Sequence, residues 1–352
     1  MFKRKKTLKL VLWVFGIILI FGVAACAPDV PIVDELPSVD LETPKEIPEV
    51  IEPTDTATVV VLTPTVVLVP GAQVNGFTWS QTQQTLERLT ADASHNLVIL
   101  DSLNSESLSP EVQVVVGVGP GLDLNGIAAN APDVAFVAVD NPDAVVADNL
   151  SLVGGSMLEM RQQAFMAGYL SALISSDYKI AALFPAEGDV SNVLAESYVV
   201  GARFLCGICQ PLFPPYNAFP QYEILTTDSD NNGFRSTVEN FSNIGVEIVY
   251  VHGELAVSDL LDNLAELDIK VVSDTSPDIL RGNWVGTIST DPGPALEALW
   301  SELLEGSAGV QIPSLMVLTD RDMGLVPDGR YRLFEDMLAD LQAGLISVEI
   351  TP

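Results

Sequence analysis

The sequence predicts an α/β protein built from two lobes, each with a doubly wound parallel sheet. Apolar strand-like runs alternate with helical segments from residue 65 to the end of the chain. The apolar runs are continuous and rich in Val, which indicates strands covered by helices on both faces. A closed barrel of eight strands is the alternative, but about nine strands with a long Pro-rich interruption at 198–223 fit two open lobes better.

The segment Val112–Asp140 shows the pattern most clearly. We predict a strand at Val112–Val116, a short helix at Leu122–Ala131 and a second buried strand at Asp133–Asp140. Glycines or a carboxylate stand where each strand ends. Ligands of open α/β sheets bind at the carboxyl edge of the strands, so these strand ends are candidate binding positions.

The same reading places the other elements, with the helix expected after the second strand shortened or lost at Ser102–Pro110. Further strands are predicted at Thr65–Val69, Asn96–Leu100, Ile180–Phe184, Glu223–Thr227, Val246–Val251, Lys270–Ser273, Trp284–Ser289 and Ser314–Thr319. Helices are predicted at Gln81–Ala91, within Ser156–Ser175, and at Val190–Leu205, Gly233–Ile244, Ser258–Leu267, Pro294–Leu304 and Leu333–Gly344.

The composition excludes several classes of function. The chain has 47 acidic and 16 basic residues, a formal net charge of −31, which repels nucleic acid. Three cysteines and two histidines are too few for a disulfide scaffold or a His-rich metal site. The sequence contains no nucleophile elbow and no metal-ligand spacing. We therefore expect a protein that is not an enzyme and has no cofactor or metal.

The first 25 residues have the features of a secretory signal. A basic stretch precedes the apolar run Leu10–Ala25, which ends in small residues before Cys26. This ending resembles a bacterial lipobox, which implies that residues 1–25 are removed and that Cys26 carries lipid on the outer face of the cell membrane. An uncleaved transmembrane anchor is the alternative, although the run is short for a span of roughly 20 residues. In both cases the rest of the chain lies outside the cytoplasm.

Residues 26–58 are rich in Pro, Asp and Glu and contain no aromatic residue. Such a segment cannot bury a core, and its composition favours an extended chain of about 3 Å per residue. We interpret it as a tether that holds the folded part away from the membrane surface.

Three stretches of the folded part resemble the basic membrane protein family of lipoproteins that serve ABC importers. They are VVGVGPGLDLNGIAANAPDVAFVAVD (Val115–Asp140), MRQQAFMAGYLSALI (Met160–Ile174) and DVSNVLAESYVVGARF (Asp189–Phe204). The resemblance implies a type I periplasmic-binding fold, with lobe I at residues 59–176 and 290–315 and lobe II at 177–289 and 316–352. It also implies a monomer, a small ligand such as a purine or nucleoside closed between the lobes, and an ABC permease as partner.

The first candidate ligand contacts follow the first predicted strand. Residues Gly76–Ser80 resemble a family loop that places an aromatic side chain on the ligand, and an aromatic ring beside a glycine is suited to stacking on a flat heterocycle. Either Phe77 or Trp79 stacks there, or Trp79 packs into the core. Asn75 and Thr78 supply hydrogen-bonding groups beside these rings, Asn75 standing where the family often has Asp.

The other candidate contacts lie at later strand ends. Gly119 lets the backbone approach a ligand or forms a tight turn, and Asp140 accepts from ligand hydroxyls or serves as a cap or hinge. By the resemblance, His252 contacts a base edge and Asp274 contacts a sugar. The nucleoside-binding branch has a Lys near Ser289 that this sequence lacks, which weakens the case for ribose recognition.

Cys206 and Cys209 form a CxxC motif at the end of a predicted helix. A redox role favours the motif at a helix start, where a thiolate is stabilised, so a structural disulfide is the better interpretation outside the cell. Two alternatives to transport stay open for the whole protein: a surface receptor that senses its ligand without transport, and an extracellular hydrolase, which has less support.

Overall fold

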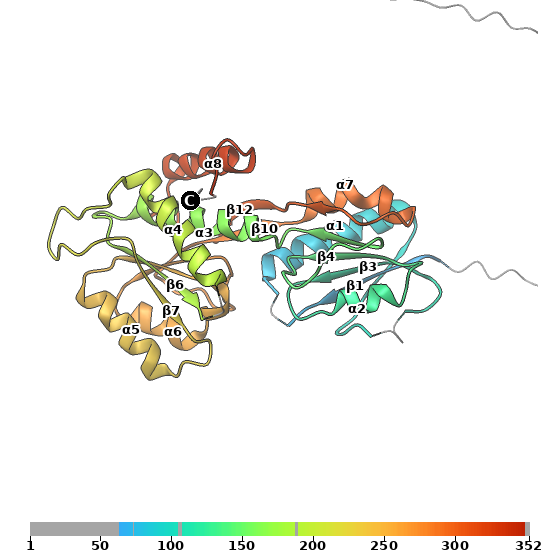
Figure 1. Ribbon diagram of the computed structural model, residues 1–352, viewed down its shortest axis with the longest axis horizontal. Helices are drawn as coiled ribbons and strands as arrows, with labels where there is room; N and C mark the ends of the chain where they lie inside the picture. Colours follow the sequence, from blue (N-terminus) through green and yellow to red (C-terminus); the bar gives the residue numbers. More distant parts are fainter. Residues whose placement is uncertain (1–62, 73, 105–107, 187–188, 349–352) are drawn as a thin grey trace, which may run out of the picture. The chain divides into compact units, whose positions relative to one another are not determined.

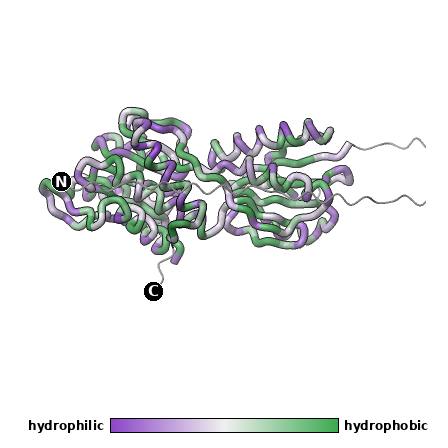
Figure 2. The backbone as a smooth tube through the Cα atoms, turned by 90° about the horizontal axis from the view of Figure 1, so that it is seen from above, coloured by the Kyte–Doolittle hydropathy of each residue, from purple (hydrophilic) through white to green (hydrophobic). Residues whose placement is uncertain are grey.

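The computed structural model describes residues 63–348 except 73, 105–107 and 187–188. The predicted signal, Cys26 and the tether lie outside the described residues. The described part contains two sheets of six strands each (Figure 1). Long hydrophobic runs follow the strands, whereas hydrophobic and hydrophilic residues alternate along the helices (Figure 2).

The first sheet is parallel throughout, in the order β11-β5-β4-β3-β1-β2. Successive residues of a strand point to opposite faces, so Val66 and Leu68 of β1 pack with α1 and α7, whereas Val67 packs on the face of α2. The elements of this lobe are β1 (Thr65–Pro70), α1 (Gly76–Ala93), β2 (Asn96–Ile99), β3 (Val112–Val118), α2 (Leu124–Ala129), β4 (Ala135–Val139), β5 (Leu150–Val153), α7 (Gly293–Leu304) and β11 (Gln311–Ile312).

The second sheet has the order β12-β10-β9-β8-β6-β7, and its last pair, β10 with β12, is antiparallel. The two-lobe α/β class is as predicted, with this one antiparallel strand added. The elements are β6 (Ile180–Pro185), α4 (Val190–Cys206), β7 (Gln221–Leu225), α5 (Asn231–Asn243), β8 (Ile248–Val251), the 3-10 helix η2 (Gly253–Leu255), α6 (Ser258–Glu266), β9 (Lys270–Ser273), β10 (Trp284–Asp291), β12 (Leu315–Thr319) and α8 (Asp328–Gln342).

Helix α3 (Met157–Ile174) packs with the second lobe, which corrects the lobe boundary expected from the sequence. Its buried residues, among them Phe165 and Leu170, belong to one core with α4, α8 and the strands of the second sheet. The apolar side chains of α3 cover most of its circumference, so the sequence does not reveal which sheet it covers.

Helices α3 and α4 approach each other at two glycines. A Cβ on Gly168 would meet the carbonyl oxygen of Tyr198, and a Cβ on Gly201 would meet the backbone of Phe165, both well inside van der Waals contact. Only glycine allows the two backbones to come this close, which resembles the small-residue packing of closely crossing helices.

The chain passes between the two sheets three times. The first crossing lies between β5 and α3 at residues 154–156, the second between β10 and α7 at residue 292, and the third between β11 and β12 at residues 313–314. The alternating lobe segments that the resemblance implied, 59–176, 177–289, 290–315 and 316–352, also require three crossings.

Several element boundaries differ from the predictions. Strands β5 and β11 were not predicted, because β5 is a four-residue run interrupted by Ser151 and β11 has two residues, too short for a period to show. Helix α1 begins at Gly76 rather than at Gln81, since Asn75 caps it. Helix α8 begins at Asp328, ahead of the apolar residues that defined the prediction.

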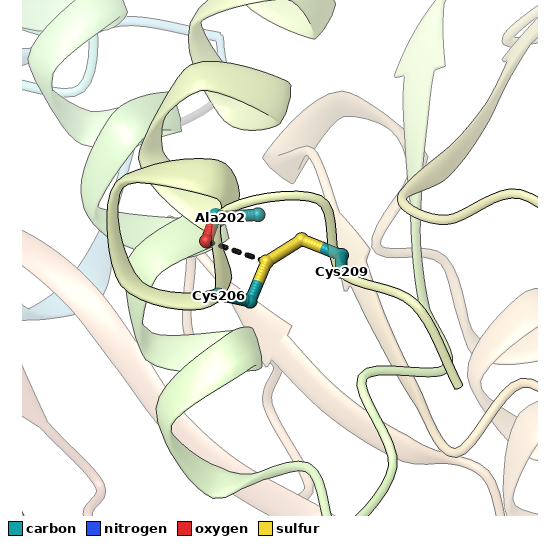
Figure 3. Close-up of a disulfide and its surroundings, with 3 residues drawn as sticks. All are labelled: Ala202, Cys206 and Cys209. Atoms are coloured by element: carbon teal, nitrogen blue, oxygen red, sulfur yellow. Dashed lines mark hydrogen bonds between the residues drawn. A yellow bond between two sulfur atoms is a disulfide. The ribbon is translucent and has the colours of Figure 1, made fainter. Parts of the chain in front are cut away.

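Cys206 and Cys209 form a disulfide at the end of α4, with the Sγ of Cys206 3.1 Å from the carbonyl oxygen of Ala202 (Figure 3). The Pro-rich loop that follows is held by a buried ion pair. Asp177 accepts from the backbone N–H groups of Leu212 and Phe213 and lies 2.9 Å from the Nζ of Lys179. Burial raises the pKa of Asp177, but Lys179 and the two N–H groups outweigh it, so the pKa lies below its ordinary value.

Within the part of the chain that the structure describes, no helix combines the length and the apolar character needed to cross a membrane.

The glycine contact between α3 and α4 yields the first prediction. Gly168→Ala and Gly201→Ala should each lower the free energy of unfolding by about 1–3 kcal/mol, since the added methyl group forces backbone apart. Gly329→Ala is the matched control, because a Cβ there meets nothing within 4 Å. Urea unfolding measures all three, and equal stabilities for Gly168→Ala and Gly329→Ala would contradict the packing.

Candidate ligand-binding site

A cavity of about 180 Å³ lies at the carboxyl ends of the strands and is lined from both lobes. Such an edge is where open α/β sheets bind ligands. The six sequence-predicted residues that line it are Asn75, Thr78, Gly119, Asp140, His252 and Asp274. Phe77 and Trp79 do not line it.

Asn75 connects the two lobes at the N-terminus of helix α1. Its Oδ1 caps the helix by accepting from the backbone N–H groups of Phe77 at 2.9 Å and Thr78 at 3.3 Å. Its Nδ2 donates to the carbonyl oxygen of Asp274 in the other lobe at 2.9 Å. One side chain therefore starts the helix and holds the two walls of the cavity together.

The expected stacking by Phe77 or Trp79 is not met in this cavity. Asn75 is the N-cap of α1, so the predicted loop Gly76–Ser80 forms the first turn of that helix. The helix turns Trp79 toward the core of the first lobe, where it packs with buried residues of that core. This was the alternative that the sequence left open for Trp79.

Thr78 belongs to a chain of hydrogen bonds that ends at Asp140. The Oγ1 of Thr78 lies 3.0 Å from both the carbonyl oxygen and the Oγ1 of Thr290, near the end of β10. The hydroxyl of Thr290 donates to the Oδ2 of Asp140. The end of β10, just before the second crossing, is thus tied to the first turn of α1 and to the end of β4 by side chains that also line the cavity.

Asp140 has a left-handed backbone conformation, with φ at +47°, which Asp and Asn tolerate better than most residues. Its Oδ1 is buried and has no hydrogen-bond partner among the described residues. The pKa of its carboxyl is raised from 3.8 to about 6, mainly by burial and to a smaller extent by Glu159, against the opposing hydrogen bonds from Thr290 and the Gly155 backbone. The carboxyl accordingly carries a proton more readily than an exposed one.

Glu159 is a cavity residue that the sequence analysis missed. Its Oε2 accepts from the backbone N–H of Ser156 at 3.1 Å and from the Ser156 hydroxyl at 2.7 Å, which completes a capping box at the start of α3. Its Oε1 accepts from the backbone N–H of Ser314 at 2.7 Å. The signal was present as Ser156-Met-Leu-Glu159, the capping-box spacing, but that spacing alone does not show that the carboxylate also reaches the third crossing.

His252 and Asp274 form the facing wall in the second lobe. The Nε2 of His252 lies 3.7 Å from the Oδ2 of Asp274, and the Tyr250 hydroxyl donates to the same oxygen at 2.8 Å. The Nδ1 of His252 accepts from the backbone N–H of Glu254 at 3.4 Å. Burial beside Asp274 raises the pKa of Tyr250 well above 10, so its hydroxyl stays a donor. The Oδ1 of Asp274 is buried without a hydrogen-bond partner among the described residues.

Gly119 contributes backbone to the same cavity. Its φ is +88°, a conformation that favours glycine, and its N–H donates to the carbonyl oxygen of Val139 at 2.8 Å. Gly119 therefore both makes the tight turn and exposes backbone to the cavity, so the two interpretations from the sequence are compatible.

The lining is partly apolar, with Val118 and Met160 among its residues, and its charged side chains are acidic. Asp140, Glu159, Glu254 and Asp274 line the cavity, whereas none of the lysines and arginines of the described residues does. The lining also contains no Phe, Tyr or Trp. Among the described residues no group of three or more His, Cys, Asp or Glu side chains is placed to hold a metal ion.

Comparison with solved structures identifies the fold. A solute-binding protein of an ABC transporter system from Conexibacter woesei is 16% identical, with a TM-score of 0.58 over 82% of this chain and 99% of its own. A solute-binding protein of the same kind from Aeropyrum pernix is 14% identical, with a TM-score of 0.56 over 82% and 94%. A transcriptional activator of the comK gene from Bacillus halodurans is 14% identical, with a TM-score of 0.56 over 80% and 98%.

At these identities the likeness establishes the architecture of type I periplasmic binding proteins and leaves function to the site. No protein-family model matches the sequence. No curated protein matches it significantly.

The buried carboxyl of Asp140 yields a prediction of pH dependence. Because its pKa is higher in the folded chain than its ordinary 3.8, the stability it contributes is complete below pH 4 and is lost as pH rises through about 6. Asp140→Asn should prevent this loss of stability, because the amide does not ionise, and Asn also tolerates the left-handed conformation. Its free energy of unfolding should match the unsubstituted chain at pH 4 and exceed it by roughly 2 kcal/mol at pH 7.5.

Urea unfolding at both pH values measures the difference. Asp268→Asn is the control, since Asp268 is exposed and also has a positive φ, of +53°. A difference for Asp140→Asn that stays constant between pH 4 and 7.5, or that shrinks with rising pH, would refute the assignment.

Proposed function

We propose that this protein is a solute-binding lipoprotein that captures a small molecule between its lobes and delivers it to an ABC permease. The observation that carries the proposal is the cavity at the strand ends, lined from both lobes by residues that include Asp140 and Asp274, each with one buried carboxylate oxygen that lacks a hydrogen-bond partner among the described residues. Buried polar atoms are normally paired, and a bound solute supplies the missing partners. The fold shared with ABC solute-binding proteins supports the same role.

Hinge closure provides the binding mechanism. Three crossing segments connect the lobes, and rotation about such segments opens and closes a site without repacking either core. A solute that contacts Asp140 in one lobe and Asp274 in the other binds the closed arrangement better than an open one, and so shifts the population toward closure. The hydrogen bond from Asn75 to Asp274 adds to that arrangement directly.

The N-terminal segment supports a position at the cell surface. A lipid on Cys26 holds the chain on the extracytoplasmic face of the membrane, and the Pro-rich, acidic residues 26–58 give the lobes reach toward a permease. The excess of acidic over basic residues after the signal also keeps the lobes away from anionic lipid.

A purine or nucleoside is the ligand class suggested by the family resemblance, but the cavity has few of the contacts that such a ligand needs. Stacking partners for a flat ring are absent from the lining, and Ser289 is followed by Thr290 rather than by a Lys. Nucleosides therefore belong in any ligand screen as one class among several.

The proposal predicts ligand-dependent stability. A solute that binds only the folded chain should raise the free energy of unfolding by about 2.7 kcal/mol at 100 times its Kd. Thermal unfolding with a library of small metabolites measures this shift. Met160→Trp should abolish it, because Met160 lines the cavity and an indole fills the space.

Met157→Trp is the matched control, since Met157 belongs to the same helix but is 41% exposed and outside the cavity. It should retain the full shift. Loss of the shift in both variants, or in neither, would place the binding site elsewhere.

The anchor yields a separate prediction. In a bacterial host fed labelled palmitate, the unsubstituted chain should incorporate label and Cys26→Ala should not, because the thiol of Cys26 is the attachment point that the lipobox implies. Cys206→Ala serves as the control and should retain the label. Label in Cys26→Ala would show that the N-terminal segment is anchored in another way.

A further inference from the structure

We infer that the solute is a small organic cation that carries N–H donors, such as a primary amine or a guanidinium. This inference rests on the proposed function and specifies the chemical class of its ligand. It is argued from the charge of the cavity, from the two carboxylate oxygens without a partner among the described residues, and from the absence of Lys, Arg, Phe, Tyr and Trp in the lining.

The charges around the cavity are unbalanced. Four carboxylates line it, and His252 is the only side chain among the described residues lining it that becomes positive on protonation. The chain is acidic throughout, so an excess of acids by itself decides little. The deciding point is burial, since a carboxylate taken out of water is costly unless it is paired.

Two of these carboxylates are buried and incompletely paired. Asp274 is 12% exposed, and its Oδ2 accepts from Tyr250 whereas its Oδ1 has no partner among the described residues. In the facing lobe Asp140 has a similar arrangement, with Oδ2 accepting from Thr290 and Oδ1 without a hydrogen-bond partner among the described residues. Each lobe thus contributes to the lining one carboxylate with an oxygen not yet paired, and a donor-bearing cation can pair with such a group.

The other carboxylates do not remove the imbalance. Glu159 already accepts from Ser156 and Ser314, so it adds negative potential with no oxygen left unpaired. His252 lies 3.7 Å from the Oδ2 of Asp274 and, when protonated, balances at most one of the four acids. A cationic solute supplies the charge that the protein lining does not.

The nature of the cation follows from three further observations. An inorganic ion is disfavoured, because no cluster of metal-ligating side chains is placed to hold one among the described residues. A quaternary ammonium is disfavoured, because such groups are bound by aromatic rings and the lining has none. The cavity of about 180 Å³ is also smaller than the 300–1,000 Å³ typical of drug-sized ligands, which favours a compact amine.

Isothermal titration calorimetry of the full chain with matched four-carbon probes tests whether the ligand must be cationic. Putrescine and agmatine should bind at least about tenfold more tightly than butane-1,4-diol or succinate, the gain expected for a charge-assisted hydrogen bond. Choline, adenosine, inosine and the chlorides of calcium, magnesium and zinc complete the panel and should bind more weakly than the amines. Affinity for the amines should fall with added salt.

Substitution of Asp274 tests whether its carboxylate charge contributes to binding of the amine. Asp274→Asn keeps the shape and still accepts from Tyr250 but removes the charge, so amine affinity should fall by about tenfold or more. Asp140→Asn is a second variant with the same expectation, in case the first does not fold. Asp268→Asn has the same change in net charge at an exposed position before β9 and should change affinity less than about twofold.

The outcomes separate the inference from the proposed function. Tight binding of adenosine, succinate, a metal ion or the diol with no binding of the amines overturns the cationic class and leaves solute capture standing. Equal loss in Asp274→Asn and Asp268→Asn overturns the role of Asp274. No binding by any probe counts against both the cationic class and the proposed function.

Discussion

Two buried carboxylates tie together every segment that crosses between the sheets. Glu159 accepts from Ser156 in the first crossing and from Ser314 in the third, and Asp140 accepts from Thr290 at the second. Ser156 and Ser314 lie outside the paired strands, so their backbone N–H groups need other partners, and Glu159 accepts from both. Thr290 is still paired within β10 and donates to Asp140 through its hydroxyl. The connection between the lobes is consequently acidic.

The same groups line the candidate binding site, so hinge and site are one structure. A change in the charge of Asp140 alters the wall of the cavity and the hydrogen bond to Thr290 together. In the proposed function, closure on a solute and binding of that solute are coupled through these shared atoms, which is the differential contact that a population shift requires. Asn75 adds a further hydrogen bond between the cavity walls, from the cap of α1 to Asp274.

Helix α3 connects the hydrophobic core of the second lobe with the polar crossing segments. Its body packs into the second lobe through Phe165 and the close contact at Gly168, where a side chain has no room. Its first turn carries Glu159 into the crossing segments, and Gln163 donates to the carbonyl oxygen of Ile288 at 2.6 Å. A well-packed helix therefore holds the hinge carboxylate in position, as a preorganised site requires.

The sequence by itself determined the two-lobe α/β class, the positions of most strands and helices, and six residues that share one cavity, because strand periodicity and strand ends are local features. Only the tertiary structure decided that α3 belongs to the second lobe, that Trp79 packs inward and that Glu159 joins two crossings. These depend on contacts between residues far apart in the chain, such as Glu159 with Ser314. Local patterns show that a carboxylate caps a helix. They do not show that Asp274 pairs with Tyr250, or Asp140 with Thr290, through one oxygen only, because those partners are distant in the chain.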